Sequence, residues 1–505
     1  MVEVKNCESG DPSRVNNKRF ATRDSRLAIR LATVFSCLVL ASCEVGPDYQ
    51  KPNMSLPIGW KEFKKPDESG KEAANEAIQA EWWKHFNDPV LDGIITHALA
   101  QNFDLKIAEA RIAEARAAVT SSRADLVPIV SAAGSGTREA NEVAFGAETF
   151  PKPFNIFQAG FDASWELDLF GGHKRALESS SALFSAAKAT RDDIKVSLLA
   201  EAARDYMNVR KLQTQVTISE NLVASEESNQ KIQQELFNAG SVPETNAIIA
   251  RTTLLQAKSQ LLNYQNILVA SEYALDLLLG EKPGYVKALV ADVKPIDVAD
   301  KNIVLQAPAE VIANRPDVRA AERRLASSTA EIGVAKAKLF PDVSLSGFFG
   351  LFSPNSDTLL QAGSKSWNVG GNITWPILNY GKLSAGVVAE KAQHEEALAT
   401  YKKSIIAALV DVESSVSSYN KQEENRALMD KTVAENKHSV DIADMRYKDG
   451  DTSLIEVISA KRTLYAAQIQ SAEATAGSAQ GFISVYKSLG GGWKTPKKPE
   501  QTAKK

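Results

Sequence analysis

Residues 104–128 read DLKIAEARIAEARAAVTSSRADLVP, and this stretch returns at 317–341 as DVRAAERRLASSTAEIGVAKAKLFP. The two stretches are identical at nine of 25 positions without a gap, at an offset of 213 residues. This spacing is far too long for a solenoid of small repeats. The pattern therefore indicates two copies of one large unit.

Further landmarks extend the duplication towards the C-terminus. At a common offset of 210 residues lie Trp165 and Trp375, Gly171 and Gly381, Gly240 and Gly450, and Gly280 and Gly490. One three-residue length change therefore separates the two parts of the repeat. The predicted division is a first repeat at 91–282, a bridge at 283–302, a second repeat at 303–490 and a disordered tail at 491–505.

Each copy has the same predicted order of elements: a helix, two strands, a very long helix, a turn and a second helix. Apolar and polar residues alternate in the strands, as in half-buried strands. The alternation is clear at 158–168, 343–349 and 368–376, and weaker at 129–137. No proline interrupts 172–238 or 382–448. A continuous helix of that length would extend about 100 Å.

A seven-residue spacing within the second long helix is typical of a coiled-coil seam. It connects Leu398, Ile405, Val412 and Tyr419. By itself the spacing indicates only that helices pack, and an ordinary bundle would produce it too.

Composition excludes several classes of protein. With 24% charged and 44% hydrophobic residues, the 505-residue chain is typical of a folded protein. Its formal charge of −3 does not indicate a nucleic acid partner. Three cysteines and five histidines are too few and too scattered for a disulfide scaffold or a zinc cluster.

The N-terminus has the features of a secretory signal. Arg26 and Arg30 precede a short apolar run at 31–40, and Leu-Ala-Ser-Cys ends at Cys43. This ending resembles the bacterial lipobox, in which the cysteine is lipidated and becomes the first residue. The expectation is a signal peptide at 1–42, a lipidated extension at 43–90, and no cofactor besides covalent lipid, such as palmitate, on Cys43. The residue after Cys43 is Glu44 rather than aspartate, so retention at the inner membrane is not predicted.

Strands of about ten residues with one apolar and one polar face suit a membrane β-barrel, although a soluble sandwich alternates as well. Four strands cannot close a barrel, whereas three chains would supply twelve and leave room for a lumen. Asp162, Glu166 and Asp168 would then line water. A closed barrel leaves no backbone group unpaired in lipid.

Several short motifs occur together between Cys43 and about Gly490. They are VGPDY at 45–49, WW at 82–83 with Phe86, Asp88, Pro89 and Leu91, ASWELDLFG at 163–171, RPDV at 315–318 with Ala321 and Glu322, Phe340 with Pro341, and Arg446 and Tyr447 with Gly450. In this combination the chain resembles the TolC/OprM outer membrane factors, and specifically the NodT-type lipoproteins of tripartite efflux systems.

The resemblance implies a mainly α fold with a small membrane β part. Three chains would form an α-barrel of long coiled-coil helices joined to a twelve-stranded transmembrane β-barrel. The protein would lie in the cell outer membrane, anchored by its lipid and spanning by its barrel, with a long periplasmic extension. Its implied partners are a periplasmic adaptor (membrane fusion protein), an inner-membrane RND-type pump and outer membrane lipid.

The implied function is a passive channel, one that conducts small molecules or drugs outward and so contributes to antibiotic resistance. An outer membrane factor of a type I protein secretion system would share these features and remains an alternative. A periplasmic adaptor would carry one hairpin rather than two copies. No catalytic constellation is apparent, so no enzyme is predicted, and the carboxylates Glu226 and Glu227 are expected on the helix surface.

The resemblance also implies a periplasmic gate near the two hairpin turns. Gly240 and Gly450 fit helix C-terminal turns, where adaptor docking is expected. The main acidic ring falls on Glu456, which predicts cation selectivity, and the second ring position is Ser459. Alternatively, Glu456 is simply a solvated residue of the tip.

The hydrogen-bonding partners of this constriction fall on Tyr447 and Thr452 on one side and on Thr245 and Asn246 on the other. Thr452 replaces an arginine, and Asn246 an aspartate, of the best-known family member. The sequence therefore predicts no salt link between the helices, only neutral hydrogen bonds of about 0.5–1.5 kcal/mol each.

Overall fold

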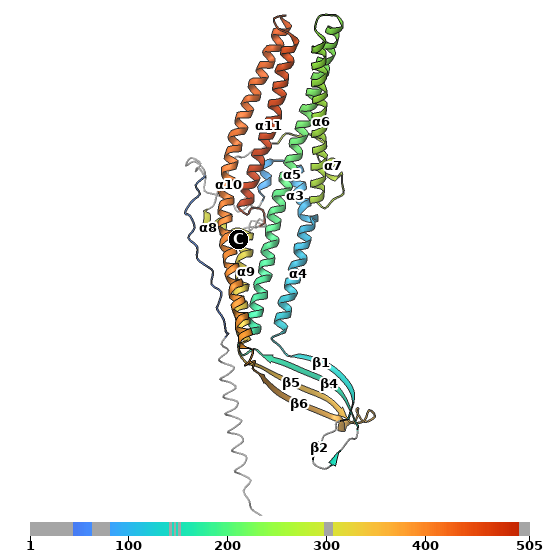
Figure 1. The fold of residues 1–505 in the computed structure, drawn as a ribbon, viewed down its shortest axis with the longest axis vertical. Coiled ribbons are helices and arrows are strands. Elements are labelled where there is room, and N and C mark those ends of the chain that lie inside the picture. The colour runs from blue at the N-terminus through green and yellow to red at the C-terminus, as the bar shows by residue number, and fades with distance from the viewer. Residues whose placement is uncertain are drawn as a thin grey trace, which may run out of the picture. The chain divides into compact units, whose positions relative to one another are not determined.

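A computed structural model describes residues 44–62, 81–140, 144–145, 148–149, 153–296 and 307–493. The predicted signal peptide, Cys43 and residues 494–505 of the predicted tail lie outside these ranges. The described chain is mainly helical and divides into two compact units (Figure 1). The first unit contains the sheet, and the second contains most of the helical residues.

A four-stranded antiparallel sheet forms the centre of the first unit. In spatial order its strands are β1 (Ile129–Glu139), β4 (Phe154–Leu167), β5 (Asp342–Ser353) and β6 (Lys365–Thr374). The β4–β5 pairing joins the two sequence copies, and the prediction of two strands per copy is confirmed. A small hairpin that the sequence did not predict, β2 (Ala144–Phe145) and β3 (Glu148–Thr149), separates β1 from β4, and the short helix η2 (Ala362–Ser364) precedes β6.

The strand register gives the sheet one apolar and one polar face. Phe161 pairs with Phe349, which pairs with Trp367, and in this chain all three side chains are exposed. The neighbouring row on the opposite face consists of Ser131, Asp162, Phe348 and Asn368, and it is polar except for the buried Phe348. Cross-strand partners share a face, so the alternation read from single strands holds across the sheet.

Ten helices make up the rest of the described chain. They are η1 (Trp82–Phe86), α3 (Pro89–Gln101), α4 (Phe103–Ala124), α5 (Gly172–Asn238), α6 (Glu244–Leu278), α7 (Tyr285–Leu289), α8 (Pro308–Asn314), α9 (Pro316–Ala337), α10 (Tyr380–Lys448) and α11 (Leu454–Ser488). In the described ranges, none of these helices combines the length and apolar character needed to cross a membrane.

The duplication is visible in helix lengths. Helices α4 and α9 both have 22 residues, and α6 and α11 both have 35. The longest pair, α5 and α10, has 67 and 69 residues. Since α4 and α9 start 213 residues apart, and α6 and α11 start 210 apart, the structure reproduces both sequence offsets.

The core of the second unit lies where the short helices meet the middle of the long ones. Trp82 of η1 stacks on Tyr486 of α11 with ring centroids 6.0 Å apart, and Tyr206 of α5 is buried beside them in the same cluster. Val412 and Tyr419 of the predicted seam join this cluster, and Ile405 is buried as well. The coiled-coil spacing therefore identified a real packing face.

The first residues of the predicted tail are ordered, which corrects that prediction. Gly491 and Gly492 are buried, and a Cβ on Gly492 would lie 2.6 Å from Leu199 Cδ1. The carbonyl of Trp493 accepts a hydrogen bond from Lys195 Nζ at 3.3 Å. Glycine is present here because this segment passes close to α5, and not because the segment has to be flexible.

Candidate functional site

Both long hairpins turn at a glycine with positive φ, +72° at Gly240 and +83° at Gly450. In each turn the amide after the glycine donates to the carbonyl five residues earlier, which closes the helix C-terminus. The two turns lie at the same end of the helical unit (Figure 1). Both glycines therefore adopt the conformation expected from the sequence.

At the tip of the second hairpin, Glu456 is already paired. Its Oε1 lies 3.3 Å from Arg446 Nη1 across the turn, and its Oε2 accepts a hydrogen bond from Thr452 Oγ1. Tyr447 stands next to Arg446 and is exposed. The sequence reading missed the role of Arg446, because α10 and α11 must run antiparallel before these residues, ten positions apart, can meet.

The other predicted gate residues are more dispersed. Thr245 and Ser459 are exposed on α6 and α11. Asn246 borders a groove of about 170 Å³ that also includes Gln233 of α5 and Ile458 and Arg462 of α11. Within the chain, Thr452 bonds to its own hairpin rather than to Asn246.

A buried ion pair joins the two hairpins, and it corrects the prediction for Glu226. Glu226 of α5 is completely buried, and Arg462 of α11 donates to both of its oxygens, with Nη2 at 2.7 Å from Oε2. Asn229 Nδ2 adds a hydrogen bond of 3.3 Å. Glu226 is thus not a surface charge but the buried partner of Arg462 in the second hairpin.

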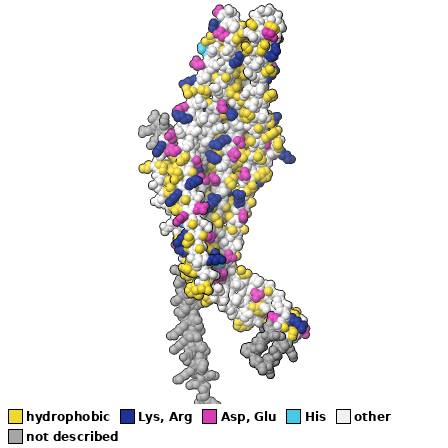
Figure 2. Space-filling view, in the orientation of Figure 1, with side chains coloured by type: hydrophobic (Ala, Val, Ile, Leu, Met, Phe, Trp, Pro, Cys, Tyr) yellow, Lys and Arg dark blue, Asp and Glu magenta, His cyan; other side chains and the backbone are white. Residues whose placement is uncertain are grey.

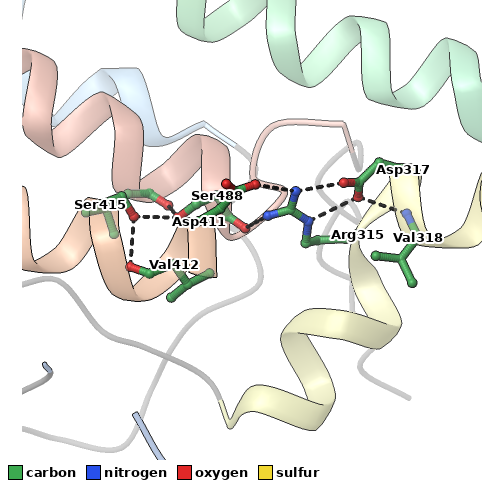
Figure 3. Close-up of polar contacts among 8 residues, drawn as sticks. Arg315, Asp317, Val318, Asp411, Val412, Ser415 and Ser488 are labelled. Atoms are coloured by element: carbon green, nitrogen blue, oxygen red, sulfur yellow. Dashed lines mark hydrogen bonds and ion pairs between the residues drawn. The ribbon is translucent and has the colours of Figure 1, made fainter. Parts of the chain in front are cut away.

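Arg315 connects three helices in the middle of the unit (Figure 3). Its Nη1 donates to the carbonyl of Ser488 at 2.7 Å, while Nε and Nη2 form a two-pronged contact with Asp317 at 3.0 and 2.7 Å. Asp411 of α10 lies 3.2 Å from Nη2. Burial lowers the pKa of Arg315, but the contacts with Asp317 and Asp411 outweigh it and keep that pKa above its ordinary value. The RPDV motif thus fixes the end of α11 against α9 and α10.

The first copy makes the same contact with an uncharged residue. Asn102, 213 positions before Arg315, donates from Nδ2 to the carbonyl of Leu278 at 2.9 Å, and Leu278 lies 210 positions before Ser488. Each copy therefore uses the residue at this junction to hold the last turn of its second hairpin helix.

The motif at 45–49 docks within the first unit. Val45 N donates to the carbonyl of Phe170 at 3.1 Å, and Asp48 Oδ1 lies 2.6 Å from Nη2 of the buried Arg175. A Cβ on Gly46, the small residue of the motif, would lie 2.6 Å from Gly333 Cα. This fit explains why the motif combines a small residue with an acid.

Of the predicted lumen residues, Asp162 and Glu166 belong to the polar face of β4. Asp168 does not, because the strand ends at Leu167. Its two oxygens accept from the amides of His173 and Lys174 at 3.1 and 2.9 Å. Asp168 therefore caps the start of α5, where an acidic side chain satisfies otherwise unpaired amides.

Comparison with known proteins agrees with this architecture. The family described as outer membrane efflux protein matches residues 94–281 and 307–491. Nodulation protein T of Rhizobium leguminosarum bv. trifolii is 29% identical over 470 residues, covering 92% of this chain and 97% of that protein. The pyoverdine export outer membrane protein OpmQ of Pseudomonas aeruginosa is 28% identical over 471 residues, covering 92% and 97%.

A solved structure extends the agreement to the fold. The outer-membrane channel OprN superposes with a TM-score of 0.79 at 32% identity, covering 89% of this chain and all of that one. The two family matches fall on the two copies of the repeat, and the fold matches along both. The chain therefore belongs to the outer membrane efflux protein family and is an outer membrane efflux channel protein.

Proposed function

We propose that three copies of this chain form one continuous channel through which small molecules pass passively from the periplasm to the exterior. A periplasmic adaptor and an inner-membrane RND-type pump would supply the cargo and the energy. One relative is named for the export of pyoverdine, which supports a small-molecule cargo. The observation that carries the proposal is that the sheet has two open edges and that the helices expose apolar side chains, so both leave surfaces that further copies of the chain could cover.

The sheet leaves two edges for neighbouring chains. Among the described residues, β1 and β6 each pair on one side only, and the apolar face that contains Phe349, Trp367 and Val369 is exposed. An apolar sheet with open edges cannot remain in lipid, since each unpaired backbone group costs several kcal/mol. Pairing β6 of one copy with β1 of the next removes the edges, and three copies supply twelve strands.

The helices show the same incompleteness, and the duplication identifies the missing partner. Within the chain, α11 packs on α5, as the Arg462–Glu226 and Arg204–Ser484 contacts demonstrate. By the 210-residue offset, α6 of the first sequence copy is equivalent to α11, and α10 of the second sequence copy is equivalent to α5. Their shared pattern predicts that α6 of one chain packs on α10 of another.

Exposure supports this pairing. A heptad on α6 is uncovered, with Ile248, Leu255, Leu262 and Val269 exposed by 46, 62, 67 and 37%. None of its equivalents on α11 (Ile458, Tyr465, Ala472 and Ala479) is exposed. On α10, Ile406 and Val410 are more than half exposed, whereas their equivalents on α5, Val196 and Ala200, are buried. Apolar side chains are visible along the helices in Figure 2.

Deletion of the gene, followed by complementation, tests the transport role. The proposal expects the deletion strain to become more susceptible to small toxic compounds and the intact gene to restore resistance. A strain that keeps its resistance profile but loses secretion of a protein would contradict efflux and favour type I secretion. A Gly450→Pro variant is a useful control. Proline cannot adopt the positive φ of Gly450, so the variant disrupts the turn at the tip and leaves the sheet unchanged.

A further inference from the structure

We propose that Arg446 determines the ion selectivity of the channel by neutralising Glu456 at the tip of the second hairpin. The inference rests on the proposed channel function. The two side chains are 50 and 53% exposed, and Nη1 of Arg446 lies 3.3 Å from Oε1 of Glu456. Both charges are therefore in contact with water, where their field can act on passing ions.

The contacts hold Glu456 in one arrangement. Arg446 approaches Oε1, and Thr452 Oγ1 donates to Oε2, so each carboxylate oxygen has a partner from its own hairpin. An unpaired ring of three glutamates would concentrate cations. With Arg446 present, each chain adds one positive and one negative charge at this level, and the attraction for cations largely cancels.

The first hairpin contributes no charge at the equivalent positions. Counting back 210 residues, Leu236 replaces Arg446, Val242 replaces Thr452 and Asn246 replaces Glu456. Where the two hairpins alternate around a ring, the charge of these positions comes from the second hairpin alone. The balance between Arg446 and Glu456 therefore decides the sign of the net charge at these positions.

Planar-bilayer recordings of the purified full-length protein test this inference. The measured quantity is the ratio of K⁺ to Cl⁻ permeability, obtained from reversal potentials near 0.1 M KCl, where the Debye length is about 10 Å. Arg446→Gln should raise the ratio by about fivefold, since one charge at 4 Å in water is worth about 1 kcal/mol. Glu456→Gln should lower it below the wild-type value.

Three further variants sharpen the result. Arg446→Lys keeps the charge and should keep the ratio, and the Arg446→Gln/Glu456→Gln double variant should return towards wild type. Lys461→Gln removes a cation from the same hairpin, one that faces Asp444 at 3.8 Å rather than Glu456. It should leave the ratio close to wild type.

An unchanged ratio in Arg446→Gln, or an equal rise in Lys461→Gln, would overturn the inference. If the Arg446→Gln variant does not assemble, the Glu456→Gln variant provides the test. An unchanged K⁺ to Cl⁻ permeability ratio in that variant also overturns the inference. A wild-type protein that conducts no ions would instead contradict the proposed channel function. The two failures are therefore distinguishable.

Discussion

Arg462 of α11 and Glu226 of α5 form a buried ion pair that joins the two sequence copies within one chain. Glu226 has no exposed surface, while Arg462 retains 38% of its side-chain exposure. The hydrogen bonding of Arg462 to the carboxylate of Glu226, which accepts, is the main cause that raises the pKa of Arg462. The pair thus combines a fully desolvated acid with a base that reaches it from the edge of the groove.

Replacing Arg462 by methionine should destabilise the helical unit by about 3–5 kcal/mol, because it leaves a buried carboxylate without a partner. The Glu226→Gln/Arg462→Met double variant should recover part of this loss. Thermal unfolding followed by circular dichroism measures both. The neighbour Glu227, which pairs with Lys258 at the surface at 2.7 Å, provides the control, and Glu227→Gln should cost no more than about 1 kcal/mol.

Arg315→Lys should destabilise the protein by about 2 kcal/mol although the charge is kept. Lysine has no planar fork, so it cannot contact Asp317 and the Ser488 carbonyl at the same time. Denaturant unfolding compares this variant with Arg324→Lys in α9, an exposed arginine that donates to Thr190 Oγ1 at 3.1 Å. Equal effects of the two variants would refute the bridging role of Arg315.

Asp205→Asn should stabilise the protein at pH 7–8 and have little effect near pH 4. Burial, helped by the nearby charge of Glu201, raises the pKa of Asp205 to about 6, against a smaller opposing effect of Arg204. The folded state therefore binds the proton more tightly than the unfolded state, and the stability contributed by Asp205 is lost as pH rises from about 4 to about 6.

Because Asp205 is only partly buried, solvent screening leaves roughly 1 kcal/mol of this effect. Unfolding curves of the wild type and the variant at several pH values measure it. A stability difference that does not change with pH would show that Asp205 ionises as it does in the unfolded chain.

Cys43→Ser should abolish acyl labelling but permit partial outer membrane assembly. Acyl chains add membrane affinity, whereas the barrel proposed here would hold the protein independently. Metabolic labelling with palmitate, combined with membrane fractionation, measures both effects. Label that persists in the serine variant would exclude Cys43 as the lipidated residue.

The sequence predicted those features that depend on spacing along the chain. The two offsets of the duplication, the alternation around Phe161 and Asp162, and the positive φ of Gly240 and Gly450 are all local or periodic, and the structure confirms them. Each requires only neighbouring residues and the geometry of one helix or strand.

Features that depend on contacts between distant segments were missed. Glu226 was expected on the surface because nothing in its own helix indicates that Arg462, 236 residues later, lies against it. The same holds for Gly492, which is packed on Leu199. Asp168 was assigned to the lumen instead of to a helix cap for a different reason, since the end of a strand and the start of a helix compete for the same residue.

Cross-linking between chains tests the assembly most directly. Thr252 of α6 and Asn436 of α10 lie 210 positions from Arg462 and Glu226, so quasi-equivalence places them together between neighbouring copies. The processing and lipidation proposed at Cys43 would leave no other thiol, because Cys7 and Cys37 precede it. A Thr252→Cys/Asn436→Cys double variant should then cross-link into a ladder that ends at three chains, while either single variant should not. A ladder that ends at two, one that continues to four, or cross-links confined within single chains would contradict the trimeric channel.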